Sequence, residues 1–466
     1  MSFEDQLYKY VSDYKSLPDW IKRFITMPLQ LIPRKYLLGR SYSKFYNEAK
    51  EFEYKSAKEI EEYQFIKVVE LLHYAYTNVE FYKNKWSQFG VNLKQIQDFN
   101  DFQKIIPFLT REDVQANPEK LLSKLYNKED YLKMNSGGST GIPLILYYLK
   151  GYSRAAEWAH MHVQWERVGY KVGSRMANLR GEFFNKDRYF SFDPYRNLLM
   201  LSSFRLTKET ADDYLFLLDK YKVEFINAYP SSLFNLIQLT SHKVFELKHL
   251  KGILLGSENI FEWQIKIIKD FFVTNNLFYW YGHGELCALG GNCEKSNNYH
   301  FFPTYSYVEL CRNTNFKNDD LIEIVGTSFI NPLMPLIRYR TQDYVETNNS
   351  ICDCGRNHKL AKKILGREQE MAIGFNGEKI TLTALIFGRH ADYFNHIKKM
   401  QIVNYNHGKL IIKIIPKSTF DDSHKKEIVD TLTVRQGMPF ESEVEIVDDI
   451  ESTARGKHRL LIRTFN

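Results

Sequence analysis

The chain has 466 residues, of which 44% are hydrophobic and 26% charged, so it can bury a large core and is expected to form more than one domain. Its net charge of +7 is small for this length, does not indicate nucleic-acid binding, and suits anionic small molecules such as nucleotides or acyl-CoA. No apolar run is long enough to span a bilayer, and the first residues lack a signal-peptide pattern, which predicts a cytoplasmic protein without a transmembrane segment.

The N-terminal part of the chain is predicted to be helical. Residues 20–42 mix basic and apolar side chains around two prolines; we expect a helix packed on its own domain, with peripheral membrane association as the alternative. From residue 59 to 82 apolar side chains recur at helical spacing, which predicts an amphipathic helix. Thr110 and the acidic residues after it are typical of a capped helix start, and residues 152–168 predict another helix.

A glycine- and hydroxyl-rich segment, residues 135–143, precedes an apolar run. Glycines allow close backbone approach, and successive N–H groups form a concave anion site, so this segment is a candidate phosphate loop. It lacks the lysine of a Walker loop, and a plain turn is the alternative interpretation. The residues that would contact phosphate are Ser136, Gly137, Gly138, Ser139, Thr140 and Gly141.

From about residue 171, short apolar runs alternate with helical patterns. Residues 223–228, 252–255 and 277–280 are strand-like, and each is followed by a polar or glycine-containing loop. This alternation predicts α/β layering, with ligands bound at the carboxyl ends of the strands. We expect an α/β protein with a large multi-layer N-terminal domain, residues 1–367, whose first sixty residues form a helical extension. Residues 368–466 should form a small, mobile α+β C-terminal domain.

These loops, taken in order, resemble those of the adenylate-forming superfamily, and within it the phenylacetate–CoA ligase-like branch that includes CapK-type polysaccharide biosynthesis proteins. The resemblance runs from about residue 68 to 461. It implies that ATP and a carboxylate form an acyl-adenylate, which a thiol, usually of CoA, or an amine then attacks. It also implies a role in surface-polysaccharide biosynthesis. The alternative is a catalytically weak nucleotide-binding or scaffold protein that kept the fold.

The resemblance implies a role for each motif. Tyr281 would flank the adenine and Asp343 would accept hydrogen bonds from the ribose, while Tyr229, Pro230 and Ser231 would line the acyl pocket. The residues it assigns to ATP are Ser136 to Gly141, Gly256, Ser257, Glu258, Tyr281, Gly282, His283, Asp343 and Arg367.

Three residues are assigned to catalysis by the same resemblance. Glu285 would hold Mg²⁺, Arg367 would contact the nucleotide, and Lys457 would enter from the small domain to neutralise charge on the α-phosphate. Three departures weaken the match: Gly284 replaces a hydroxyl residue that binds the α-phosphate, Gln342 replaces a glycine, and an acidic pair after Arg367 is changed.

The cysteines suggest a metal site. Five is an odd, low number, which argues against a disulfide framework. Cys352 and Cys354, separated by one residue, could complete a Cys₃His zinc site with Cys293 and His300. Cys287 is an alternative ligand, and cysteines buried as small hydrophobic residues are the other interpretation. The resemblance also implies a structural metal in some relatives.

Overall fold

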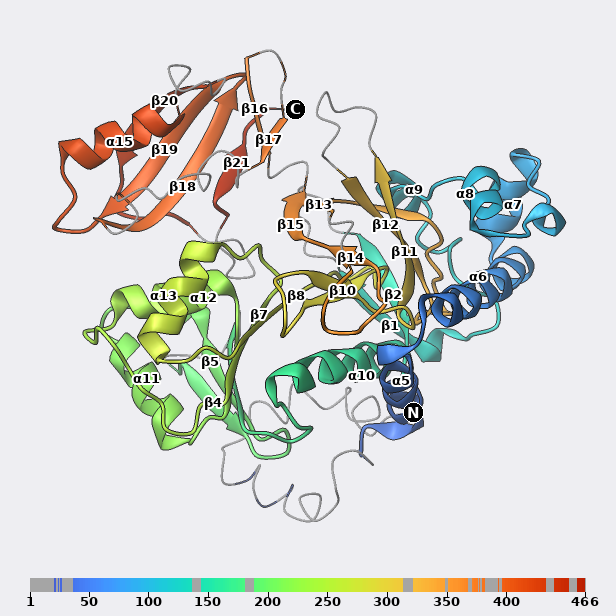
Figure 1. Cartoon of the computed structure of the whole chain (residues 1–466), viewed down its shortest axis with the longest axis horizontal. Helices are drawn as coiled ribbons and strands as arrows, with labels where there is room; N and C mark the ends of the chain where they lie inside the picture. The colour runs from blue at the N-terminus through green and yellow to red at the C-terminus, as the bar shows by residue number, and fades with distance from the viewer. Residues whose placement is uncertain are drawn as a thin grey trace.

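The computed structural model describes most of the chain: residues 37–135, 144–180, 188–312, 322–347, 351–367, 371–375, 379–381, 396–432, 440–451 and 459–465, with a few isolated positions. The predicted α/β class is confirmed. Figure 1 shows a large region of helices and several sheets, with a smaller sheet domain from the C-terminal end of the chain, orange to red, at the upper left. The boundary at residues 367 and 368 falls beside residues outside the described ones and stays a prediction.

The N-terminal helices pack along one side of the large region (Figure 1). The predicted helix over 59–82 begins earlier, at the Ser56–Glu59 capping box, and ends at Val79, which forms an isolated bridge with Ser123. The predicted capping of the next segment by Thr110 is confirmed. The predicted helix at 20–42 lies largely outside the described residues. The helices are α5 (Gly39–Glu51), α6 (Ala57–Asn78), α7 (Glu80–Gln88), α8 (Phe99–Ile105) and α9 (Arg111–Ala116).

A two-stranded hairpin flanks the candidate phosphate loop. Strands β1 (Tyr131–Asn135) and β2 (Ile145–Leu149) are antiparallel, and Asn135 pairs with Ile145. The hairpin therefore brings together the two ends of the segment 136–143, which itself lies outside the described residues. The predicted helix after it is α10 (Ser153–Trp165), which packs against α5; the Tyr42 hydroxyl and His162 Nδ1 lie 2.8 Å apart.

The central element is a nine-stranded sheet. Its order is β14-β10-β9-β8-β7-β6-β3-β5-β4, and the run from β8 to β5 is parallel. The helices α11 (Ala211–Lys220), α12 (Pro230–Leu239) and α13 (Glu262–Phe272) connect its strands. The strands are β3 (Met176–Arg180), β4 (Phe190–Asp193), β5 (Leu198–Ser202), β6 (Phe225–Ala228), β7 (Gly252–Gly256), β8 (Leu277–Gly282), β9 (Leu289–Asn292), β10 (Tyr299–Phe301) and β14 (Leu360–Ala361).

The two faces of this sheet bury different side chains. Phe225 and Leu254 point into a core that includes α10, whereas Ile226, Ile253 and Leu255 point into the core of α11 and α12. This alternation follows from the period of two along a strand. Because helices cover both faces, the strands read as continuous apolar runs.

Strand β3 lies at a change of direction in the sheet. From β3 the chain continues to β5 on one side, and then crosses to β6 on the other. Adjacent parallel strands whose connections leave in opposite directions open a crevice at their carboxyl ends, where ligands bind in such sheets. The crevice is therefore expected beside Arg180 and Ala228, the last residues of β3 and β6.

A second, antiparallel sheet carries the expected ribose motif. Its order is β11-β12-β13-β15, and Asp343 on β13 pairs with Arg367 on β15. Arg338, directly before β13, forms a buried ion pair with Glu309 at 2.8 Å, which fixes the start of the strand. The strands are β11 (Ser306–Arg312), β12 (Ile322–Ser328), β13 (Tyr339–Glu346) and β15 (Lys363–Arg367).

The C-terminal module has its own core around Ile402, Ile412 and Ile428. The predicted turn at His407 and Gly408 joins β18 to β19, and a Cβ at Gly408 would lie 2.4 Å from the Phe375 ring, so this turn requires glycine. Its elements are β16 (Met371–Ile373), β17 (Lys379–Thr381), β18 (Ile397–Asn406), β19 (Lys409–Pro416), α15 (Asp422–Leu432), β20 (Glu441–Ile446) and β21 (Leu461–Arg463). In the described part of the chain, no helix combines the length and apolar character needed to cross a membrane.

Candidate active site

Two of the predicted ligand loops meet at the carboxyl ends of the parallel strands. Ser231, at the start of α12, donates from its backbone N and from Oγ to the two carboxylate oxygens of Glu258, both at 3.0 Å. The carboxylate thereby caps the N-terminus of α12, where a negative charge is stabilising. The expected acyl-pocket motif, residues 229–231, and the expected adenine motif, residues 256–258, are thus joined directly.

Gly256 and Trp280 are buried against each other at these strand ends. A Cβ at Gly256 would lie 2.4 Å from the indole of Trp280, so only glycine lets the ring lie against the end of β7. The next residue, Ser257, has a φ of 68°, in the left-handed region. The backbone of the expected adenine loop therefore turns sharply away from the sheet.

The two residues assigned to the nucleoside are in contact. The Tyr281 hydroxyl, at the end of β8, donates to Asp343 Oδ2 at 2.6 Å. Asp343 is 5% exposed, and its backbone N donates to Thr341 Oγ1 at 3.0 Å. The hydrogen bond connects the parallel sheet with the antiparallel sheet, and it fixes a carboxylate at the strand ends.

Glu285 is buried between two basic side chains. Its Oε2 lies 3.1 Å from His283 Nδ1, and its Oε1 lies 3.9 Å from Arg111 Nη1. Mg²⁺ in nucleotide sites is bound by one or two carboxylates together with substrate phosphates. Glu285 supplies one such carboxylate, so these residues fit Mg²⁺ when ATP phosphates provide further ligands.

Gly284, which stands where the resemblance implies a hydroxyl residue, is held in a defined position. The Tyr148 hydroxyl donates to the carbonyl of Gly284, and a Cβ at Gly284 would make only ordinary contacts, at 3.7 Å to that hydroxyl and 3.8 Å to Leu146. Packing therefore does not demand glycine here. The Nε2 of His283 is buried and has no hydrogen-bond partner among the described residues, so Nε2 is the ring atom left for a ligand while Nδ1 faces Glu285.

Two site residues were missed by the sequence reasoning. Arg111 was interpreted only as part of a helix start, although it faces Glu285. Arg180 ends β3, and its guanidinium carbon lies 5.0 Å from the Tyr229 ring and 5.4 Å from the Trp280 ring. A basic residue directly after a strand-like run was the available signal for Arg180.

The guanidinium of Arg180 is also hydrogen-bonded at the crevice of the sheet. Its Nη2 donates to Asn227 Oδ1 at 2.9 Å and its Nη1 to Ser257 Oγ at 3.3 Å. A planar cation held between two rings and two neutral oxygens is well oriented for a carboxylate or phosphate. The predicted residues Ser136 to Gly141 and Lys457 lie outside the described residues, as does the side chain of Arg367.

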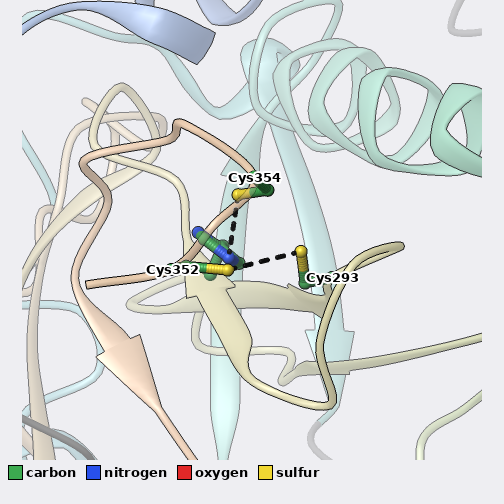
Figure 2. Close-up of side chains that lie close together, drawn as sticks. Cys293, Cys352 and Cys354 are labelled. Carbon is green, nitrogen blue, oxygen red and sulfur yellow. Dashed lines mark hydrogen bonds between the residues drawn. The ribbon is translucent and has the colours of Figure 1, made fainter. Parts of the chain in front are cut away.

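The four predicted metal ligands lie together. Figure 2 shows the three cysteines among them. The ligand atoms of Cys293, His300, Cys352 and Cys354 all lie within 4.8 Å of one another. They come from the loop after β9, from β10, and from the segment before β14. Cys287, the alternative ligand, lies elsewhere, with its sulfur 3.4 Å from the carbonyl of Glu285.

The surroundings of this cluster suit metal ligation. Burial, together with the charges of Arg167 and Arg356, lowers the pKa of His300 to about 3, so the imidazole is neutral, as a metal ligand must be. The sulfurs of Cys293 and Cys354 face the backbone N of Lys295 and Arg356, at 3.3 and 3.5 Å. Such donors would stabilise thiolates.

Comparison with known proteins shows which of them this chain resembles. Residues 373–464 match the family described as the CapK C-terminal domain. Protein CapK of Staphylococcus aureus is 22% identical over 451 residues, which cover 93% of this chain and 96% of CapK. The resemblance to the CapK-type branch is confirmed. The chain also shares its fold with solved ligases.

Structures of 2-hydroxyisobutyryl-CoA ligase superpose on most of this chain. The postadenylation state in complex with 2-HIB-AMP has a TM-score of 0.68 at 17% identity, covering 88% of this chain and 91% of the ligase. An open conformation in complex with 2-HIB-AMP and CoA has a TM-score of 0.55, also at 17% identity, covering 88% of this chain and 93% of the ligase. The predicted adenylate-forming fold is confirmed.

Proposed function

We propose that this chain is an ATP-dependent ligase that converts a carboxylate into an acyl-adenylate and transfers the acyl group to a thiol, CoA by preference, or to an amine. The observation that carries the proposal is the 2.6 Å hydrogen bond between Tyr281 and Asp343. It brings the two nucleoside motifs together at the ligand-binding edge of the sheet, beside the buried Glu285. The 2-HIB-AMP and CoA named in the complexes of the related fold support the same chemistry.

The proposed reaction has two steps. In the first, an oxygen of the substrate carboxylate attacks the α-phosphorus of ATP, and the bond to pyrophosphate breaks. In the second, the sulfur or nitrogen of the acceptor attacks the acyl carbon, and AMP leaves with the bonding electrons. Both steps depend on positioning and on neutralising negative charge.

The chain's own residues have defined tasks in this scheme. The Asp343 carboxylate would accept hydrogen bonds from the ribose, and Tyr281 would keep that carboxylate in place. Glu285 would hold Mg²⁺, which when bound neutralises phosphate charge. His283 Nε2 would contact the nucleotide phosphates, and Lys457 would approach from the C-terminal module during adenylation.

The biological setting is a further part of the proposal. The similarity to CapK favours the modification of a surface polysaccharide, with a sugar acid or a small organic acid as the carboxylate. A phenylacetate-type substrate is not favoured by any contact of the described residues. The cytoplasmic location and the peripheral membrane association remain predictions, since the relevant N-terminal segment lies outside the described residues.

Pyrophosphate exchange tests the proposal. Purified protein is incubated with ATP, Mg²⁺, labelled pyrophosphate and a panel of carboxylates, including uronates, hydroxy acids, amino acids and aryl acetates. We expect exchange with one class of acid, and a loss of at least a hundredfold in Lys457→Ala with little change in ATP binding, because the lysine acts on the transition state. ATP binding without exchange for any acid would instead favour the scaffold alternative, which the absent hydroxyl at Gly284 suggests.

A further inference from the structure

We propose that Cys293, His300, Cys352 and Cys354 bind one zinc ion, and that this ion fixes residues 352–358 in the shape that clamps the N-terminal extension onto the large domain. The extension is defined here as residues 39–55, which comprise α5 and the 3-10 turn Phe52–Tyr54. The proposal concerns stability and docking, and it is independent of the ligase activity.

The separations within the cluster match those of a zinc site. Zinc binds thiolate at about 2.3 Å and imidazole at about 2.0–2.1 Å in a tetrahedron, so two sulfurs should lie about 3.8 Å apart and a sulfur and a nitrogen about 3.6 Å apart. The sulfurs of Cys293 and Cys352 lie 3.6 Å apart (Figure 2). Cys354 Sγ lies 3.5 Å from His300 Nε2. Three thiols and an imidazole are also the donors that zinc prefers over harder cations.

The site would be structural. Four protein ligands complete the tetrahedron and leave no position for a substrate. The ligands join a loop after β9, the edge strand β10 and the segment that leads into β14, so one ion would hold three pieces of chain. Ser296 Oγ lies 3.3 Å from the sulfur of Cys352, which adds a hydrogen-bond donor to the third thiolate.

Arg356 connects this site to the N-terminal extension. It follows Cys354 by two residues and is 3% exposed. Its Nε and Nη2 donate to Oε1 of Glu53 at 3.0 and 2.8 Å, and its Nη1 donates to the carboxylate of Glu294 at 2.8 and 3.0 Å. One carboxylate belongs to the extension and the other follows Cys293, so the guanidinium is held between the two.

Neighbouring residues extend the same contact. The Asn357 side chain donates to the carbonyl of Lys55 at 2.9 Å, and His358 Nε2 lies 3.2 Å from the carbonyl of Phe52. The ring of Tyr54 lies 5.2 Å from the guanidinium carbon of Arg356. Residues 356–358 thus contact the whole 3-10 turn, while they themselves lie outside any helix or strand.

The clamp should depend on the metal for a physical reason. A buried ion pair stabilises a protein only when its geometry is well fixed, because both charges have lost their hydration. Among the described residues, the segment 352–358 makes few backbone hydrogen bonds, so the cysteine ligands are what would hold Arg356 in place. Without the ion, Arg356 and Glu53 should exchange their contact for water.

Metal analysis and hydrogen–deuterium exchange test the proposal together. We expect about one zinc per chain in wild-type protein and in Cys311→Ser, a cysteine on β11 outside the cluster, and less than a tenth of that in Cys352→Ser. Removing zinc from wild-type protein with a chelator should speed amide exchange in residues 39–55 at least tenfold, and adding zinc back should reverse it. Exchange in β18 and β19 of the C-terminal module should not change.

A second variant separates the clamp from the metal. Arg356→Gln keeps all four ligands, so it should retain zinc and yet show the faster exchange in residues 39–55. Wild-type protein from zinc-supplemented culture that contains no zinc, or a mass spectrum showing Cys293 and Cys352 joined as a disulfide, would overturn the metal site. Zinc binding with unchanged exchange after chelation would overturn the clamp. If Cys352→Ser fails to fold, chelation of the wild-type protein still tests the effect of losing the metal.

Discussion

The hydroxyl of Tyr281 and the carboxylate of Asp343 lie 2.6 Å apart, although 62 residues separate them in the chain. The bond spans two sheets, β8 on one side and β13 on the other. It holds the Asp343 carboxylate in place between the two sheets. Nucleotide binding by this protein should therefore depend on Asp343 more than on Tyr281.

Asp343→Ala should weaken ATP binding by about 10- to 150-fold, since charge-assisted hydrogen bonds contribute about 1.5–3 kcal/mol. Tyr281→Phe removes only the hydroxyl that orients the carboxylate, so its loss should be about tenfold or less. Isothermal titration calorimetry with ATP and Mg²⁺ measures both. Equal affinity in wild type and Asp343→Ala would show that the ribose site is misassigned.

Gly284→Ser should raise the rate of pyrophosphate exchange with the cognate acid by about tenfold or more, because it restores a donor aimed at the phosphates. The side chain fits, since the new Cβ would lie 3.7 Å from the nearest atom. Gly256→Ser is the matched control: its Cβ would lie 2.4 Å from Trp280, so thermal unfolding should occur at a lower temperature. An unchanged exchange rate in Gly284→Ser would exclude a role for that hydroxyl here.

Arg180→Met should raise KM for the carboxylate by about tenfold or more while KM for ATP stays within about twofold, because the guanidinium faces the crevice between β3 and β6. Arg180→Lys keeps the charge but loses the planar fork and its stacking on Tyr229, so its effect should be intermediate. Steady-state exchange kinetics distinguish these cases. A change in KM for ATP alone would place Arg180 in the nucleotide site.

Stability should fall on mild acidification because of two buried histidines on α10. Burial lowers the pKa of His160 to about 4 and that of His162 to about 3, whereas both take up protons near pH 6.5 when unfolded. The two neutral histidines make their full contribution to the free energy of unfolding above pH 6.5, and this contribution is lost as the pH falls toward their folded pKa values. Between pH 7.5 and pH 5, each histidine should lower the free energy of unfolding by about 2 kcal/mol.

Urea unfolding at these two pH values checks this prediction. His162→Gln keeps an acceptor for Tyr42 but does not titrate. Between the two pH values, the free energy of unfolding of this variant should therefore fall by roughly 2 kcal/mol less than that of the wild type. Identical pH dependence in both proteins would contradict the assignment of a neutral, buried His162.

Much of the fold followed from local patterns. The run of β6, β7 and β8 was predicted because buried parallel strands read as short apolar runs followed by loops. The helix predicted over 59–82 was wrong at its end: its periodicity continues, but Val79 pairs with Ser123 from a distant segment and breaks the helix. Local periodicity does not report such a contact.

Site residues of rare types could be assigned a role from the sequence, whereas site residues of common types could not. Three cysteines and a histidine have few roles, so their meeting could be expected from the chain alone. Arginines are frequent on surfaces, and only the folded arrangement shows Arg111 facing Glu285. Gln342 illustrates a third case: it stands where the resemblance implies a glycine, and its φ of 59° lies in the left-handed region that favours glycine.

The contact between Glu53 and Arg356 also sets an order of events during synthesis. The two residues are 303 positions apart, and ribosomes add roughly 5–20 residues per second. Glu53 therefore leaves the ribosome roughly 15–60 s before the arginine that receives it. For that interval α5 can already pack against α10, but Glu53 lacks the guanidinium that neutralises it. The turn that carries Glu53 should consequently be the last part of the N-terminal extension to become ordered in newly made protein.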